Sequence, residues 1–366
     1  MTDNLFWRLP KGPVISTVLL ILLGALAADS ASMLLYLRFP SVKFAFFLKH
    51  ILFILVGITL GYILISIKQK FYLRGWLIVL SNIALFSLLL AVFLFPARNG
   101  AHRWVEVGGV TFQPSELAKV VLILTLSYLL VNKRANLWQN LTLIYLTAMV
   151  GLVALEPDIG TAFFLLALGS FLMLLGRLSF RKLLRWAGIL LLLIGVLVLF
   201  TDKGKHVRRR IKDFFSKKET RVVSTQAYQA LVALGSGGLT GSSPGESLEK
   251  FFYLPEAHSD YIFSILGEEL GFVGTSAVIF LFLLLLYSGF SAAAYLNNPQ
   301  ASLIAYGVSF SLVFQALINI TVNVGLFPTK GIPLPFMSYG GTAMISALLQ
   351  VALLVHLWAW RRENDT

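Results

Sequence analysis

Apolar residues dominate the chain in long runs that short polar segments separate. A helix needs about 20 mostly apolar residues to span a bilayer, and ten runs approach or exceed that length. They cover roughly residues 14–36, 44–66, 75–96, 115–131, 138–155, 158–176, 183–200, 260–296, 301–325 and 338–360. The pattern predicts an all-α, polytopic membrane protein with about ten transmembrane helices. Residues 1–366 are predicted to form a single transmembrane domain with one large loop at about 201–259.

The composition strengthens this prediction. Hydrophobic residues make up 57% of the 366-residue chain and charged residues 13%, with a mean hydropathy of +0.81. Soluble domains are roughly 45–50% apolar. The sequence has no cysteine, which excludes disulfides and thiolate metal sites. The net charge of +13 favours membrane lipids with anionic headgroups, or an anionic lipid-linked substrate, as partners. Nucleic acid is not expected as a partner of so apolar a chain.

Lysine and arginine set the predicted orientation. With the N-terminus inside, the short loops on its side of the membrane hold more Lys and Arg than those on the opposite side. Such an excess marks the cytoplasmic side, so both termini are predicted to be cytoplasmic and the loop at 201–259 extracytoplasmic. Most Asp and Glu residues lie in or just inside the outer segments. Acidic residues contribute little to topology, so this skew indicates chemistry at the outer face.

Four outer connections are dense in polar residues, and each precedes a helix that descends from the outer face. The N-terminus of a helix carries partial positive charge and N–H groups without helical partners, so it favours anions. Four such ends around one cavity would form an anion-binding site.

The first connection contains Arg103 and the stretch Gln113–Lys119. Pro114 suits the first turn of a helix, and Glu116 and Lys119 lie three residues apart on one helical face. Two interpretations of Lys119 remain open. It either pairs with Glu116 and extends outward to the membrane interface, or it directs its charge at a phosphate.

The second connection places Asp158 between two apolar helices with almost no loop. Asp158 can cap the following helix. A role in the site instead requires that it faces the same cavity as Glu116 and Lys119.

The third connection is the loop at 201–259, which is basic in its first half. That half predicts either an amphipathic segment on anionic headgroups or a solvated loop. Glu256 and His258 lie at its exit, and Asp260 lies where the loop becomes a helix. Ionisable groups at such partly desolvated positions are costly and are functional candidates.

The fourth connection, Phe327–Gly341, is rich in Pro and Gly and contains Lys330 and Ser338. It lies at membrane depth in the predicted topology. Irregular backbone is tolerated there only against protein or beside a water-filled cavity, so the segment is predicted to line the cavity.

With these motifs the chain resembles a known family, the SEDS proteins (shape, elongation, division and sporulation), which include FtsW and RodA. The resemblance covers the whole chain. It rests on long stretches that occur in order, namely Gln113–Lys119, Glu156–Thr161, Leu254–Gly271 and Gly331–Gly341.

The same stretches are most similar to the division branch of the family, FtsW. Glu156 before Pro157 and the stretch Pro328–Gly331 look FtsW-like, whereas Ile332–Pro333 looks more RodA-like. The segment Gly241–Gly245 departs from the pattern of both branches, so its loop geometry stays open.

The resemblance implies a peptidoglycan glycosyltransferase that polymerises lipid II into glycan strands at the outer face of the cytoplasmic membrane. It also implies a growing glycan strand, a cognate class B penicillin-binding protein (a transpeptidase) and other divisome or elongasome proteins as partners. By position, Asp260 matches the essential acidic residue of the family. Arg103, Glu116, Lys119 and Asp158 match its other polar site residues.

For this chemistry we expect Asp260 to be the general base that takes the proton of the acceptor hydroxyl, a role worth typically 10²–10⁴-fold. Arg103 and Lys119 are expected to compensate the charge of the leaving pyrophosphate, with Lys330 a weaker candidate. The remaining predicted substrate-binding residues are Glu116, Asp158, Glu256, His258 and Ser338.

Glu116 and Asp158 would orient these cations or, together with Asp260, hold a divalent ion. Oxygen ligands with phosphate suit Mg²⁺ or Mn²⁺, although the sequence contains no dedicated metal motif.

Two other classes of function are compatible with a membrane bundle. A lipid II flippase would need polar residues along a path through the bilayer, whereas here they concentrate at one depth. A non-catalytic divisome scaffold would explain the helices but leaves Asp260 and Lys119 without a role. The glycosyltransferase is therefore the favoured hypothesis.

Overall fold

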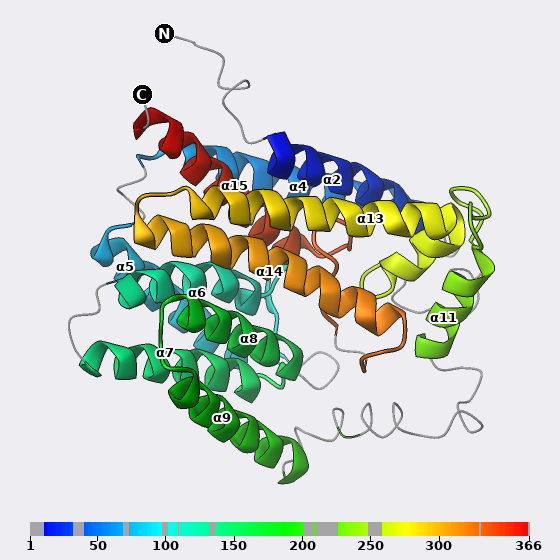
Figure 1. The fold of residues 1–366 in the computed structure, drawn as a ribbon. Helices are drawn as coiled ribbons and strands as arrows, with labels where there is room; N and C mark the ends of the chain where they lie inside the picture. Colours follow the sequence, from blue (N-terminus) through cyan, green and yellow to red (C-terminus); the bar gives the residue numbers. More distant parts are fainter. Residues whose placement is uncertain are drawn as a thin grey trace.

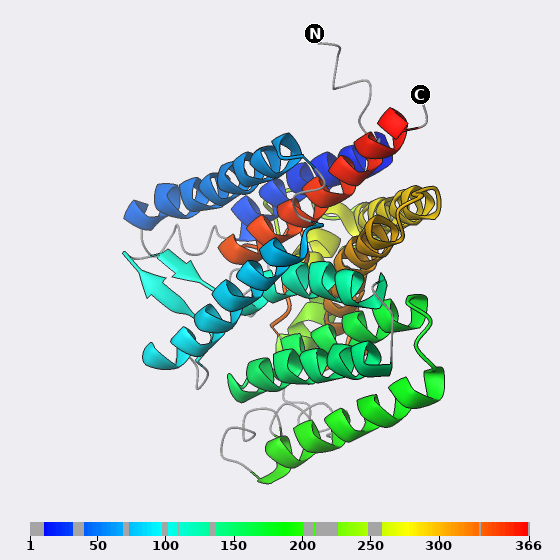
Figure 2. The same cartoon turned by 90° about the vertical axis from the view of Figure 1, so that its left-hand side faces the viewer.

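The protein is a bundle of helices (Figure 1), and its described residues include one small hairpin, seen as two arrows in Figure 2. The structure is a computed structural model that describes residues 11–31, 40–68, 73–96, 102–108, 110–131, 136–200, 208, 226–247, 258–328 and 331–364. Its helices are α2 (Lys11–Ala31), α4 (Pro40–Ser66), α5 (Gly75–Ala91) with the 3₁₀ turn η1 (Val92–Leu94), α6 (Pro114–Val131), α7 (Asn136–Leu155), α8 (Ile159–Leu175), α9 (Phe180–Phe200), α11 (Gln226–Ser236), α13 (Ile262–Ala294), α14 (Pro299–Asn323) and α15 (Gly341–Asn364). Strands β1 (Val105–Val107) and β2 (Val110–Phe112) pair antiparallel.

The all-α prediction is confirmed, and each predicted apolar segment coincides with a helix. Within the described ranges, seven helices are long and apolar enough to cross a membrane: α2, α4 from Leu48, α5 with η1, α6, α13, α14 and α15 up to Ala359. The number of ten spans stays a prediction. Helix α11 was not predicted and lies within the loop at 201–259, of which the structure describes residue 208 and residues 226–247 and 258–259.

Large apolar side chains cover the outside of the bundle. Leu52 is 54% exposed, Ile83 60%, Leu192 69% and Phe280 62%. Exposed apolar surface on this scale is costly in water but matches the hydrocarbon of a bilayer, where helices satisfy their own backbone groups. The arrangement is that of a multi-pass membrane protein.

Successive helices alternate in direction, so the beginnings of α6, α8, α13 and α15 lie toward one end of the bundle. The beginning of α2 and the end of α15 lie toward the other (Figure 1). Helix α15 packs on α4, and α13 packs on α14 and α2. Figure 2 shows α9 at the edge of the bundle away from α2, α4 and α15. The candidate residues of the outer connections therefore gather at one end.

A glycine kink in α13 seats the segment that follows α11. Gly271 adopts φ +65° and ψ −162°, and a Cβ there would lie 2.5 Å from the nitrogen of Gly241 and from the carbonyl oxygen of Leu239. The kink exposes backbone groups to this segment, so that the N–H of Phe272 donates to the carbonyl of Gly238 at 2.9 Å. Only glycine combines this left-handed conformation with so close a backbone approach.

We predict that Gly271→Ala lowers the stability of the protein by at least about 1–2 kcal/mol, the cost of a left-handed L-residue, because the methyl group also collides with the backbone. Gly188→Ala is the matched control, since a Cβ at Gly188 in α9 meets nothing within 4 Å and alanine favours a helix. Thermal unfolding in detergent measures both variants. Equal melting temperatures for the two would contradict the prediction.

Candidate active site

Asp158 joins the beginning of α8 to the first polar connection. Its Oδ1 accepts from the backbone N–H of Thr161 at 3.2 Å, which caps α8, and its Oδ2 accepts from Gln113 Nε2 at 3.1 Å. Arg103 lies beside it, with Nη1 at 3.8 Å from Oδ1 and Nη2 donating to the carbonyl of Pro157 at 2.6 Å. Asp158 therefore both caps its helix and holds Arg103, whose side chain is 24% exposed.

Glu156 is a further acidic residue of this cluster, and the sequence interpretation used it only as a marker of the branch. Its side chain is fully buried, and neither carboxyl oxygen has a hydrogen-bond partner within the described part of the chain. Burial, reinforced by the negative charge of Asp158 and opposed by Arg103, raises the pKa of Glu156 to about 9. Glu156 is therefore protonated and neutral at pH 7.

Lys119 points into the bundle. Its ammonium donates to Glu116 Oε2 at 2.8 Å and to Gln315 Oε1 at 2.7 Å, and it lies 5.0 Å from the centre of the Phe164 ring. Lys119 is only 2% exposed. The interpretation in which Lys119 extends outward to the interface is wrong, because its charge is compensated by Glu116 inside the protein.

A stripe of amides on α14 holds the irregular fourth connection. Gln315 donates to the carbonyl of Pro333 at 2.8 Å, and Asn319 donates to that of Ile332 at 2.9 Å. Asn323 is the next member of the stripe. The sequence analysis missed these residues, although amides spaced at i, i+4 and i+8 in an apolar helix share one face and would have revealed them.

The same amides fix the backbone at Asp260. The carbonyl of Asp260 accepts from Asn319 and from Asn323, each at 3.0 Å. Asp260 is a half-buried residue just before α13, and a Cβ at Gly331 would lie 3.6 Å from Asp260 Oδ2. Asp260 is thus held by its main chain, with its side chain near Gly331 of the fourth connection.

Ser338 ties the exit of the long loop to the fourth connection. Its hydroxyl donates to the carbonyl of Ser259 and accepts from the N–H of Leu334 at 2.8 Å. The N–H of Tyr339 donates to the carbonyl of His258 at 2.9 Å, and the two rings meet edge to face. In this arrangement Ser338 and His258 shape the site through backbone contacts.

Glu256 and Lys330 lie outside the described residues. Among the residues that the structure does describe, no three His, Asp or Glu side chains come together as metal ligands. Glu116 is paired with Lys119, and Asp158 with Arg103. The binding of Mg²⁺ or Mn²⁺ stays a prediction.

The described polar residues form one connected system at the end of the bundle where α6, α8, α13 and α15 begin. Gln113 directly precedes α6 and the Glu116–Lys119 pair lies on it, so α6 links the Asp158 cluster to Gln315 of α14. Helix α15 joins the same system, since Thr342 Oγ1 accepts from the N–H of Gln113 and Ser346 donates to the carbonyl of Glu116. Direct hydrogen bonds or shared neighbours thus bring together seven of the predicted site residues: Arg103, Glu116, Lys119, Asp158, His258, Asp260 and Ser338.

Comparisons with known proteins agree with this architecture. The model of the family described as cell cycle protein, which groups FtsW, RodA and SpoVE, matches residues 12–363. The probable peptidoglycan glycosyltransferase FtsW of Coxiella burnetii (strain RSA 493 / Nine Mile phase I) is 32% identical over 99% of both chains.

Solved structures show the same fold. A chain from a peptidoglycan synthase complex that coordinates polymerization and crosslinking is 25% identical and superposes with a TM-score of 0.77, over 96% of this chain and 97% of that one. The rod shape determining protein RodA of Thermus thermophilus is 26% identical with a TM-score of 0.70, over 97% of each chain. From the family match along nearly its whole length, its shared fold and its relatives, the chain belongs to the FtsW/RodA/SpoVE family.

Proposed function

We propose that this protein is a peptidoglycan glycosyltransferase that polymerises lipid II into glycan strands. The observation that carries the proposal is the position of Asp260, a half-buried acidic residue whose backbone is fixed by two amides at the end of the bundle where the other polar residues gather. A relative of similar length is named a probable peptidoglycan glycosyltransferase, which supports the same activity here.

In the proposed reaction the 4-hydroxyl of the acceptor sugar attacks C1 of the donor. The new C–O bond forms as the bond between C1 and the pyrophosphate oxygen breaks, and the polyprenyl pyrophosphate leaves with the electron pair. Asp260 accepts the hydroxyl proton. General-base assistance of this kind contributes typically 10²–10⁴-fold.

The Arg103 cluster supports compensation of the leaving charge. Asp158 balances the charge of Arg103, and a neutral Glu156 keeps the cluster from becoming negative overall. A second carboxylate in its charged form would repel pyrophosphate in this low-dielectric setting. The protonation of Glu156 therefore keeps the site receptive to an anion.

Lys119 acts in this proposal as a positioning residue. It holds Gln315, and Gln315 holds the carbonyl of Pro333 next to the segment that faces Asp260. A direct contact with pyrophosphate would require that Lys119 exchange Glu116 for the substrate.

The proposal extends to the setting of the enzyme. We place it in the cytoplasmic membrane with both termini in the cytoplasm, the loop at 201–259 and the site outside, and residues 1–366 as one domain. A class B penicillin-binding protein is the proposed partner, in line with the similarity to a chain of a peptidoglycan synthase complex. The FtsW relatives favour a division role within the divisome. A flippase is not favoured, because the connected polar residues lie at one end of the helices.

We predict that Asp260→Asn abolishes polymerisation of labelled lipid II, with a loss of roughly 10²–10⁴-fold, and leaves lipid II binding intact. Asparagine keeps the shape of the side chain but does not accept the proton. If Asp260 only shapes the start of α13, asparagine will be nearly harmless, since it has almost the same shape and its side chain still forms hydrogen bonds. Expression and complex formation with the transpeptidase are the controls. A polymerisation rate above about a tenth of wild type would move the base role elsewhere.

A double-mutant cycle separates the two possible roles of Lys119. Lys119→Met leaves Glu116 buried without its partner and is expected to cost about 3–5 kcal/mol of stability. Adding Glu116→Gln removes the stranded charge, so the double variant should recover both stability and much of the polymerisation. A double variant that is stable but inactive would show that the ammonium contacts the substrate. Thermal unfolding and the lipid II assay give the two readouts.

Glu156→Gln is predicted to stabilise the protein by about 3 kcal/mol at pH 7. The buried Glu156 must take up a proton on folding, which costs about 1.4 kcal/mol for each pH unit above its ordinary pKa of 4.5, whereas glutamine needs no proton. Because the folded pKa of about 9 lies above the ordinary value of 4.5, the folded state binds the proton more tightly than the unfolded chain. Wild-type stability therefore falls as the pH rises from 4.5 toward 9, whereas the variant lacks this term. Exposed Glu246→Gln is the control. A constant difference between wild type and Glu156→Gln across this pH range would refute the protonation argument.

A further inference from the structure

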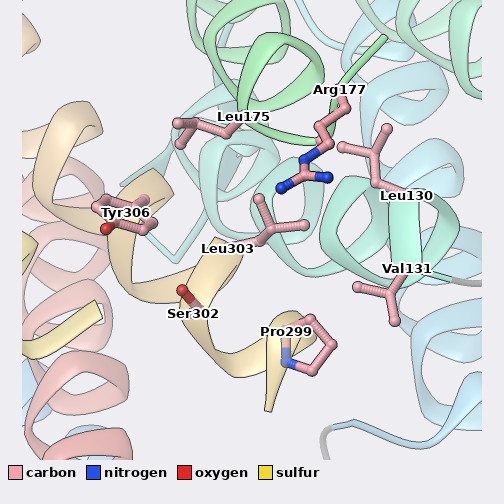
Figure 3. A pocket seen from close by; sticks show the side chains of 9 residues that line it. Leu130, Val131, Leu175, Arg177, Pro299, Ser302, Leu303 and Tyr306 are labelled. Carbon is pink, nitrogen blue, oxygen red and sulfur yellow. The ribbon is translucent and has the colours of Figure 1, made fainter. Parts of the chain in front are cut away.

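A cavity lies at the end of the bundle opposite the candidate active site. It has a volume of about 390 Å³ and opens between the ends of α6 and α8 and the beginning of α14 (Figure 3). Its lining is mainly apolar, from Leu130, Val131, Leu175, Pro299, Leu303 and Tyr306, with Ser302, Gly176 and Arg177 as the other members. A volume in this range fits part of a ligand, and two of its apolar lining residues are exposed, Val131 by 36% and Leu175 by 39%.

Arg177 is the one charged residue of this lining. Figure 3 shows its guanidinium in the cavity, between Leu303 and Leu130. Its backbone is left-handed, with φ +59°. The hydrogen bonds around it are those of a Schellman motif, in which Arg177 N–H donates to Leu174 and Leu178 N–H donates to Met173, each at 2.9 Å. The left-handed position of this motif is normally glycine.

Packing explains why the glycine of this turn does not occupy the left-handed position. Gly176 comes one residue earlier, and a Cβ there would lie 2.9 Å from the side chain of Leu130. The close packing of α8 on α6 thus requires glycine at position 176. The next residue, Arg177, therefore adopts the strained left-handed conformation. Strained residues of this kind are concentrated at functional sites.

The charge at the mouth of the cavity is positive. The N-terminal end of α14, capped by Asn298, contributes the positive end of its dipole. Within the described part of the chain, Arg177 takes part in no salt bridge. A ligand with an anionic group at the guanidinium would complement the charge of Arg177, and an apolar body on the same ligand would complement the apolar lining of the cavity.

We propose that this cavity binds an anionic phospholipid, with the phosphodiester headgroup at Arg177 and an acyl chain along Leu303 and Tyr306. The membrane supplies such a molecule directly, and basic pockets between transmembrane helices bind anionic headgroups. The site is separate from the proposed active site, because it lies at the other ends of α6, α8 and α14. Its role is to fix the packing of these helices at the end where α2 begins and α15 ends.

Thermal unfolding of the purified full chain in detergent tests the proposal, with phosphatidylglycerol, phosphatidylcholine or inorganic phosphate added. Wild type should be stabilised by phosphatidylglycerol and by neither of the others. In Arg177→Gly the affinity for phosphatidylglycerol should fall by about fivefold or more, the effect of one basic residue at an anionic lipid. Glycine suits the left-handed position, so this variant should melt at or above the wild-type temperature without lipid. Arg181→Gln, an exposed basic residue of α9, is the matched control and should keep the wild-type response.

Native mass spectrometry gives a second readout, since wild type and Arg181→Gln should retain phosphatidylglycerol and Arg177→Gly should lose it. An unchanged response of Arg177→Gly to phosphatidylglycerol would overturn the proposal. Equal stabilisation by phosphatidylcholine would show an apolar lipid contact only, and equal stabilisation by inorganic phosphate would show a simple anion site. Each of these outcomes also contradicts it.

Discussion

The structure depends on how irregular backbone is accommodated inside a membrane protein. The fourth connection and the start of α13 have carbonyl groups that no helix satisfies, and an unsatisfied group in hydrocarbon costs several kcal/mol. Helix α14 supplies the missing donors through Gln315, Asn319 and Asn323. This single amide face fixes the main chain at Asp260 and the segment opposite it, so the position of the candidate base follows from hydrogen bonds to its own backbone carbonyl.

Buried charge imposes the second constraint. Low dielectric makes an unpaired ion costly, and the site resolves this in three ways. Lys119 and Glu116 neutralise each other inside the bundle, Asp158 is held by Arg103 and a helix cap, and Glu156 keeps its proton. The polar cluster is therefore close to neutral as a whole, which lets an anionic substrate approach while the bundle stays packed.

The same helices organise both ends of the molecule. At one end the beginnings of α6 and α8 carry the polar system, and at the other their ends form the cavity with the beginning of α14. Because each helix is rigid along its length, packing at the Arg177 end sets the spacing of the elements that hold the polar end. This gives a physical reason for membrane lipid and the reaction site to share a scaffold.

The sequence by itself determined the long apolar helices and the end at which the polar residues gather, because apolar runs of membrane length and helix-start residues such as Pro114 and Asp158 are local signals. Tertiary structure decided the partners. Lys119 turns inward because it meets Gln315, 196 residues away in the chain, and Ser338 is occupied by the backbone of Ser259. The burial of Glu156 also depends on neighbouring helices. Local pattern does not encode such long-range contacts, because they arise only when the helices pack.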